Sequence, residues 1–163
     1  MPGRSIATHC MSAETFTLDT NILVYSVDGS AGSRHDIAKI IVERAAIGPC
    51  CLTLQAISEF FFVVTRKGIM GRTEARPITE ALIDLFPTVA VSATAVRAAL
   101  ATTSSGRASY WDALLIHTAA EAGCTAILTE DLAADTTLAG VRVINPFAGA
   151  TLSTDAEALL AID

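Results

Sequence analysis

Residues 15–26 have the sequence TFTLDTNILVYS, in which a short apolar run ends at Asp19 and continues directly into a second apolar segment. We predict a strand from Thr15 to Leu18 and a brief helix over 21–26. The same alternation continues along the chain, and Ser33 is expected to cap the second helix. Further strands are predicted at 50–53, 88–91, 125–129 and 141–144, and further helices at 33–48, 54–67, 77–85, 93–101 and 109–122.

The predicted strands are apolar throughout and do not alternate with polar residues, as a strand with one wet face would. Strands of this kind that alternate with helices indicate a parallel sheet covered on both faces. The expected fold class is therefore α/β, a three-layer sandwich with a central parallel sheet of about five strands. In such sheets a ligand site lies beyond the carboxyl ends of the strands.

Length and hydropathy indicate one domain. The chain has 163 residues, of which 52% are hydrophobic, which suffices for one core. We expect residues 1–14 to be a flexible N-terminal arm, 15–147 the folded domain, and 148–163 a C-terminal tail or short helix. The longest apolar runs are interrupted by Glu59 and His117, so no segment is expected to span a membrane. Residues 1–14 lack the features of a secretory signal, and a cytoplasmic location is expected.

Cysteine usage and net charge narrow the function classes. Cys10, Cys50, Cys51 and Cys124 show no Cys-x-x-Cys spacing and are expected to be reduced thiols. The net charge of −6 argues against a nucleic-acid partner, because affinity for phosphate depends on Lys and Arg. The distribution of charge matters more than its sum. A basic segment and one loop cation are candidate phosphate contacts: Arg66, Lys67, Arg72, Arg76 and Arg107, the last of which could equally be a solvated loop residue.

Four acids stand at informative positions. Asp19 and Asp131 directly follow predicted strands, whereas Glu59 and Asp112 lie near the starts of predicted helices. Each also has a structural interpretation. Asp19 and Asp131 could cap the turns that follow them, Glu59 could belong to a solvated helix stripe, and Asp112 could complete a capping box with Ser109.

A shared location of the four acids favours the functional over the structural interpretation. The predicted topology brings all four acids to one edge of the sheet, where carboxylates repel one another and need a compensating cation. Oxygen ligands suit hard ions such as Mg²⁺ or Mn²⁺. A metal ion can make hydroxide from water and neutralise charge on a phosphate, so phosphodiester hydrolysis is the natural chemistry.

Four short motifs carry a family resemblance: LDTNILVY at 18–25, ISEF at 57–60, YWDALL at 110–115 and LTEDL at 128–132. In this order they resemble the PIN-domain nucleases, from about Thr15 to Phe147, and most closely the VapC-type toxins of bacterial toxin–antitoxin pairs. The resemblance implies a PIN fold, Mg²⁺- or Mn²⁺-dependent cleavage of RNA, and inhibition by a cognate antitoxin.

The resemblance also implies roles for individual residues. Asp19, Glu59, Asp112 and Asp131 match the family's acidic quartet and would be both catalytic and metal-binding. Thr20 or Asn21 matches the polar residues that support the first Asp, and Asp135 is a candidate fifth acid. The basic residues named above would then contact RNA.

Three alternatives stay open at this point. A stand-alone RNA-processing PIN nuclease needs no antitoxin. A small-molecule phosphohydrolase would explain the acids and the lack of basic charge, but enzymes that form an aspartyl-phosphate need a second Asp two residues after the first, where this chain has Asn21. A non-catalytic binding module would use the same fold to hold a partner.

The aromatic residues suggest partners. Phe60, Phe61 and Phe62 span about 200° of a helix, so one of them is expected to be exposed or in an interface. A homodimer or an antitoxin helix could cover that surface. Trp111 is interpreted as a packing residue, with base stacking as the alternative, and His117 as a satisfied core side chain.

Overall fold

A parallel sheet forms the centre of the protein, whose computed structural model describes residues 14–161. One part of the sheet has the order β1-β4-β6-β5, and β2 pairs with β3. A parallel bridge between Phe16 and Cys50 joins the two parts, so that the parallel strands follow the order β3-β2-β1-β4-β6. The strands are β1 (Phe16–Leu18), β2 (Leu52–Thr53), β3 (Thr88–Val89), β4 (Ala126–Leu128), β5 (Thr137–Leu138) and β6 (Val141–Ile144).

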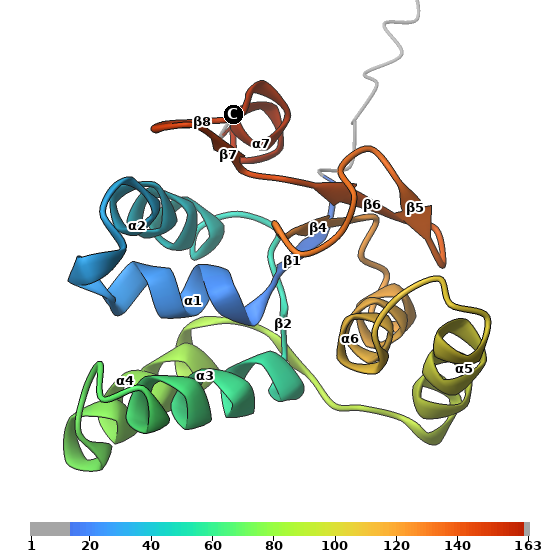
Figure 1. Cartoon of the computed structure of the whole chain (residues 1–163), viewed down its shortest axis with the longest axis horizontal. Coiled ribbons are helices and arrows are strands. Elements are labelled where there is room, and N and C mark those ends of the chain that lie inside the picture. Colours follow the sequence, from blue (N-terminus) through green and yellow to red (C-terminus); the bar gives the residue numbers. More distant parts are fainter. Residues whose placement is uncertain (1–13, 162–163) are drawn as a thin grey trace, which may run out of the picture.

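Helices cover the sheet on both sides, as Figure 1 shows, with α1 to α4 on one side of the strands and α5 and α6 on the other. A short hairpin and α7 close the chain above the second helix. The helices are α1 (Thr20–Val27), α2 (Ser33–Ala45), α3 (Leu54–Arg66), α4 (Arg72–Leu85), α5 (Ala93–Ser104), α6 (Tyr110–Glu121) and α7 (Thr154–Leu159), with a 3₁₀ turn at Gly29–Ala31 and the hairpin strands β7 (Phe147–Ala148) and β8 (Thr151–Leu152). The predicted α/β sandwich is confirmed.

Several element boundaries differ from the prediction. Ser33 is the first residue of α2 and not its cap, because Gly32, with φ of +61°, occupies the capping position and no side chain caps the helix. Helix α4 begins at Arg72 and contains Pro77, which was predicted to open it. Burial of Ala75 in the core anchors the extra first turn. No strand was predicted between 130 and 140, but this stretch contains β5, which pairs antiparallel with β6.

The ends of the chain bear on the predicted domain limits. Cys10 and residues 1–13 of the predicted N-terminal arm lie outside the described residues. The hairpin begins at Phe147 and is followed by α7, and the division at 148 stays a prediction. In the part of the chain that the structure describes, no helix is long and apolar enough to cross a membrane.

The core forms between the sheet and its helices. Strands β1 and β4 are buried at every position, as expected for central parallel strands. Cys50, Cys51 and Cys124 are buried free thiols, in line with the prediction. Phe60 is 1% exposed and Phe62 is 56% exposed, so the expectation that one of the three phenylalanines is exposed is confirmed.

The difference in exposure between Phe60 and Phe62 gives a first testable prediction. Phe60→Ala should lower the free energy of unfolding by about 3–5 kcal/mol, because it leaves a cavity in the core. Phe62→Ala, two positions away on the same helix, should cost less than about 1 kcal/mol, since its ring is mostly solvated. Urea unfolding of both variants measures the two values. Equal losses would contradict the assigned orientation of α3.

Candidate active site

Asp19 lies where β1 ends and α1 begins. Its backbone N–H donates to the Leu128 carbonyl (3.0 Å), which extends the pairing of β1 with β4 by one residue. Although Asp19 occupies the N-cap position of α1, its side chain makes no capping hydrogen bond. Instead, the Thr129 hydroxyl donates to Asp19 Oδ2 (2.8 Å). The structural interpretation of Asp19 as a helix cap is therefore wrong.

The electrostatic position of Asp19 is unfavourable. The side chain is buried at 6% exposure. The pKa of Asp19 is raised to about 7, and burial is the largest cause. The neighbouring carboxylates of Asp131 and Asp112 also raise it, while the hydrogen bonds from the Thr129 hydroxyl and the Thr20 backbone act in the opposite direction. A buried carboxylate near two other acids calls for a nearby positive charge.

Asp112 lies in the first turn of α6, where a carboxylate interacts favourably with the helix dipole. The Ser109 hydroxyl caps this helix by accepting from the Asp112 N–H (3.2 Å), and it donates to Asp112 Oδ2 (2.5 Å). The predicted pairing of Ser109 with Asp112 is thus present. It differs from a full capping box because Asp112 accepts from the hydroxyl and not from the capping amide.

Asp131 is held by two of its neighbours. The Asn21 amide donates to Asp131 Oδ2 (2.6 Å), and the Asp131 N–H donates to Thr129 Oγ1 (3.1 Å). Thr129 therefore accepts from the backbone of one acid and donates to the carboxylate of another. Asn21, predicted as a supporting residue, contacts Asp131 and not Asp19.

Glu59 joins the site from the second turn of α3, a helix that Thr53 caps. The Thr20 hydroxyl donates to Glu59 Oε2 (3.3 Å), and Gln55 Nε2 donates to Glu59 Oε1 (2.8 Å). Thr20 directly follows Asp19, so it links the first two acids. Gln55 Nε2 also donates to the Trp111 carbonyl (3.2 Å), which ties α3 to the start of α6.

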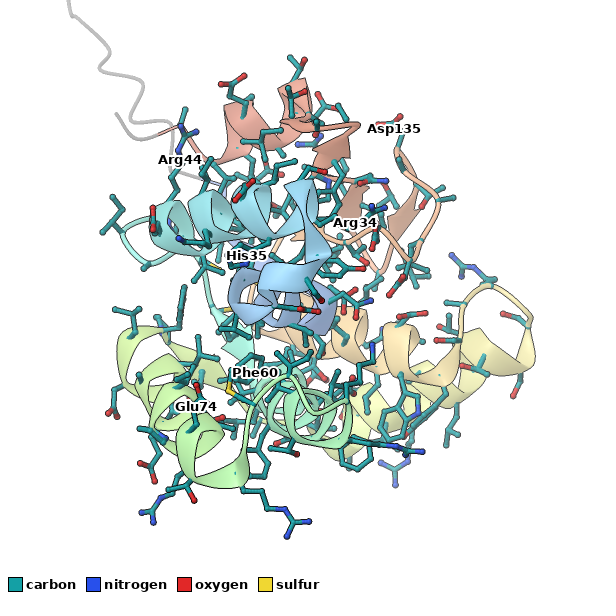
Figure 2. The ribbon with its side chains drawn as sticks, turned by 60° about the vertical axis from the view of Figure 1, so that its left-hand side comes forward. Arg34, His35, Arg44, Phe60, Glu74 and Asp135 are labelled. Carbon is teal, nitrogen blue, oxygen red and sulfur yellow. The ribbon has the colours of Figure 1, made fainter. Side chains whose placement is uncertain are left out.

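A second network beside the site involves residues that the sequence analysis did not assign. Tyr25 OH donates to Glu130 Oε1 (2.5 Å), and Arg34 forms an ion pair with Glu130 Oε2 (2.9 Å). The Arg34 guanidinium also lies 5.3 Å from the centre of the Phe147 ring. Figure 2 shows Arg34 reaching from α2 toward this region. Because Glu130 precedes Asp131, the network fixes the turn that presents the fourth acid.

The pKa values in this network follow from its contacts. Burial and the hydrogen bond to Glu130 raise the pKa of Tyr25 to about 12. Burial also raises the pKa of Glu130, but the hydrogen bonds from Tyr25 and Arg34 outweigh it and leave that pKa below its ordinary value. Glu130 therefore stays ionised as the acceptor that joins α1, α2 and the turn.

Other predicted residues lie apart from the acids. Asp135 is exposed, has φ of +62°, and points outward at the periphery of the molecule in Figure 2. The four residues of the basic segment are exposed around the turn between α3 and α4, which Figure 1 places at the opposite end of α3 from its start. Arg76 is paired there with Glu80 (2.8 Å).

Arg107 occupies a different position, in the loop before α6. It lines a pocket of about 270 Å³ together with residues of the loop that follows Asp131, including Leu132, Ala133 and Thr136. Its side chain is exposed. Of the predicted cations, Arg107 therefore lies in the loop that leads into the helix of Asp112 and beside the loop that follows Asp131.

Sequence reasoning missed Thr129, Gln55 and the network around Glu130. Thr129 lies inside the LTEDL motif and was predicted as the last residue of a strand. The structure ends that strand at Leu128, so Thr129 directly follows a buried strand, as Asp19 does. The partners of Glu130 come from two other helices, and no spacing along the chain indicates them.

A divalent cation is the group that the acids suggest. Among the described residues, no three Asp, Glu, His or Cys side chains lie close enough together to enclose a metal ion as they stand. Each acid of the quartet accepts a hydrogen bond from its own neighbour instead. The candidate ligand atoms nevertheless fit a hard cation, since all of them are carboxylate oxygens and the charge of buried Asp19 is uncompensated.

The fold and this site define a class: an α/β protein whose acids gather beyond the carboxyl ends of a parallel sheet. The chain belongs to the PIN domain family, whose family model matches residues 16–137. Comparison with the curated proteins gives no match.

Solved structures of similar fold are toxins and toxin–antitoxin complexes. VapC20 of Mycobacterium tuberculosis, described as a sarcin-ricin loop cleaving toxin, has a TM-score of 0.56 and 16% identity over 69% of this chain and 87% of its own. A toxin–antitoxin complex from Klebsiella pneumoniae has a TM-score of 0.56 and 21% identity over 82% and 98%. DNA-bound VapBC from Salmonella typhimurium has a TM-score of 0.56 and 13% identity over 80% and 96%. The predicted resemblance to PIN domains and VapC proteins is confirmed at the level of family and fold.

The burial of Asp19 gives the second prediction. Its folded pKa of about 7 exceeds the ordinary value of 3.8, so the native state binds the extra proton between these values and loses stability as pH rises through them. Asp19→Asn removes this penalty and can still accept from Thr129. In EDTA the variant should match wild type near pH 4 and be more stable above pH 7, by at most about 4 kcal/mol.

Thermal unfolding from pH 4 to 8 measures the difference. Asp84→Asn, on the exposed surface of α4, is the matched control and should show no such trend. A stability difference between wild type and Asp19→Asn that does not change with pH would contradict the assigned environment of Asp19.

Proposed function

We propose that this protein is a metal-dependent endoribonuclease that hydrolyses RNA phosphodiester bonds and acts as the toxin of a toxin–antitoxin pair. The observation that carries the proposal is the buried carboxylate of Asp19 beside Asp112 and Asp131, in a chain of the PIN domain family. Capping alone does not account for it, because Asp19 caps nothing.

The proposed cofactor is Mg²⁺ or Mn²⁺, held by Asp19, Asp112 and Asp131 with Glu59 as the fourth acid. When bound, such an ion supplies a water of lowered pKa and a counter-charge for the phosphate. Asp135 is left out of this set, because it is exposed at the periphery.

The chain's own residues orient the acids. Thr129 holds Asp19, Asn21 holds Asp131, and Ser109 holds Asp112. These donors favour one orientation of each carboxylate, which reduces the reorganisation needed when a cation binds. Thr20 and Gln55 do the same for Glu59.

Cations around the site are proposed to bind the RNA backbone. Arg107 shares its pocket with the loop that follows Asp131, and we assign it the phosphate nearest the acids. Arg66, Lys67, Arg72 and Arg76 lie further along α3 and α4, where they are proposed to contact more distant phosphates.

The proposed partners are an antitoxin and a second copy of the chain, in the cytoplasm. The structural neighbours from Klebsiella and Salmonella are toxin–antitoxin assemblies, and their likeness to this chain is one of fold. Exposed apolar side chains such as Phe62 and Leu54 offer surface that either partner could cover.

The third prediction tests the site. Asp19→Asn and Asp112→Asn should lower Mn²⁺-dependent RNA cleavage by more than ~100-fold, the upper range for residues that only support a metal ligand. Thr129→Val, which removes the hydroxyl, should fall within roughly 10–100-fold. Asp84→Asn serves again as the surface control, and circular dichroism checks the fold.

Cleavage is followed on labelled RNA with Mg²⁺, Mn²⁺ or EDTA. Equal cleavage by wild type and Asp19→Asn would remove Asp19 from the metal site. Hydrolysis of a small phosphate ester, with RNA left intact, would replace the proposal by a phosphohydrolase.

The fourth prediction tests the biological role. Expression of the chain alone should slow bacterial growth, whereas Asp19→Asn should be harmless at the same expression level. Co-expression of the proposed antitoxin, sought as a small reading frame next to the gene of this protein, should restore growth and yield a stable complex on purification. A lone chain that cleaves RNA but leaves growth unchanged would make the protein a stand-alone processing nuclease.

A further inference from the structure

An apolar groove opens directly beside the acids. Its volume is about 530 Å³, and one of its walls is Trp111, which is 60% exposed. We call it the Trp111 groove, and its lining residues are Gln55, Ser58, Glu59, Phe62, Val63 and Trp111. Glu59 belongs both to the groove and to the acidic quartet, and Trp111 directly precedes Asp112. The groove is therefore continuous with the candidate active site.

The aromatic wall of the groove is held in place. The Trp111 ring packs against Tyr110 edge to face, with 5.2 Å between ring centres. Its backbone lies in the first turn of α6, which Ser109 caps, and its carbonyl accepts from Gln55 Nε2. An exposed indole on so fixed a backbone loses little freedom when a flat ligand stacks on it.

The charges along the groove select its occupant. The ionisable group in its lining is Glu59, which repels a phosphate but accepts a neutral ring. At the outer end, the Arg66 guanidinium lies 5.5 Å from the centre of the Phe62 ring. The apolar lining of the groove thus lies between the acids and the Arg66 guanidinium. This arrangement suits a polymer in which neutral flat groups alternate with anions.

The size of the groove agrees with a small occupant. Its volume falls in the range of sites for small molecules, roughly 300–1,000 Å³. Its six lining residues are far fewer than the ~20–30 per side of a stable protein interface. A partner helix would need much more of the surface than the groove itself.

We propose that the Trp111 groove is a nucleobase subsite, in which a base of single-stranded RNA next to the scissile phosphate stacks on Trp111. Arg66 then contacts the backbone phosphate on the far side of that base. This assignment rests on the proposed function and gives Trp111 the base-stacking role over simple packing.

Tryptophan fluorescence tests the subsite directly, because Trp111 is the chain's single tryptophan. The full chain is titrated with a short single-stranded oligoribonucleotide, in EDTA and again with Mg²⁺. The matched probes are the same ribose-phosphate backbone without bases, and inorganic phosphate. Stacking predicts strong quenching by the oligoribonucleotide and little change with the two probes that lack bases.

Two substitutions separate stacking from apolar contact. Trp111→Leu keeps apolar surface but removes the ring, and should weaken RNA binding by roughly fivefold or more, the lower limit for one base stacked on an aromatic side chain. Trp111→Phe keeps a ring and should recover most of the affinity. The loss should be larger in KM than in kcat, because stacking holds substrate and transition state alike.

Leu85→Ala is the control, since Leu85 is 55% exposed at the end of α4 and outside the groove. It should leave RNA affinity unchanged. Unchanged affinity in Trp111→Leu would overturn the proposal. So would a Trp111 emission that shifts with protein concentration but not with RNA, because the groove would then be an interface between copies of this chain.

The outcomes separate the subsite from the proposed function. If wild type cleaves RNA but shows neither quenching nor an effect of Trp111→Leu, the nuclease proposal stands and the subsite fails. If RNA quenches Trp111 and Trp111→Leu weakens binding, but no cleavage occurs with any metal, the subsite stands and the nuclease proposal fails.

Discussion

Parallel pairing of β1 with β4 places Asp19 and Thr129 in contact although they lie 110 positions apart in the chain. The rest of the site depends on this pairing. It orients Asp19, brings the turn with Asp131 to the same edge of the sheet, and leaves room for the starts of α3 and α6 beside them. The edge of a parallel sheet is a natural ligand site for this reason, since connections converge there from both faces.

Gathering acids in this way opposes folding. Asp19 is buried near two other carboxylates, and its raised pKa measures how poorly the free protein tolerates its charge. The hydroxyl and amide donors around the quartet reduce the cost without removing it, because a hydrogen bond carries no net positive charge. The nearby Glu130 differs from Asp19, because the guanidinium of Arg34 compensates its negative charge. Glu130, whose charge is compensated, supports the turn, whereas Asp19, whose charge is not, is the acid that we propose to bind a cation.

Local sequence pattern and strand topology were enough to predict where the four acids lie. Asp19, Glu59, Asp112 and Asp131 were assigned to one edge because each stands at the end of a strand or the start of a helix, and the structure places Asp112 and Asp131 near Asp19, with Glu59 linked through Thr20. The role of Arg34 was not predictable, because it follows from how α2 packs against the turn. The cap of α2 was wrongly assigned to Ser33, since Gly32 occupies that position, and the start of α4 was wrongly placed at Pro77, since burial of Ala75 supports an earlier first turn.

The order of the strands along the chain also sets when the site comes into being. During synthesis β1 leaves the ribosome before its partner β4, which follows 110 residues later in the register that pairs Phe16 with Ala126. Until then Asp19 has no Thr129 to hold it, and no shorter nascent chain contains all four acids. For a chain proposed to cut RNA, the site can therefore assemble only after residues 126–131 have been synthesised, and the preceding part of the nascent chain has no complete acidic quartet.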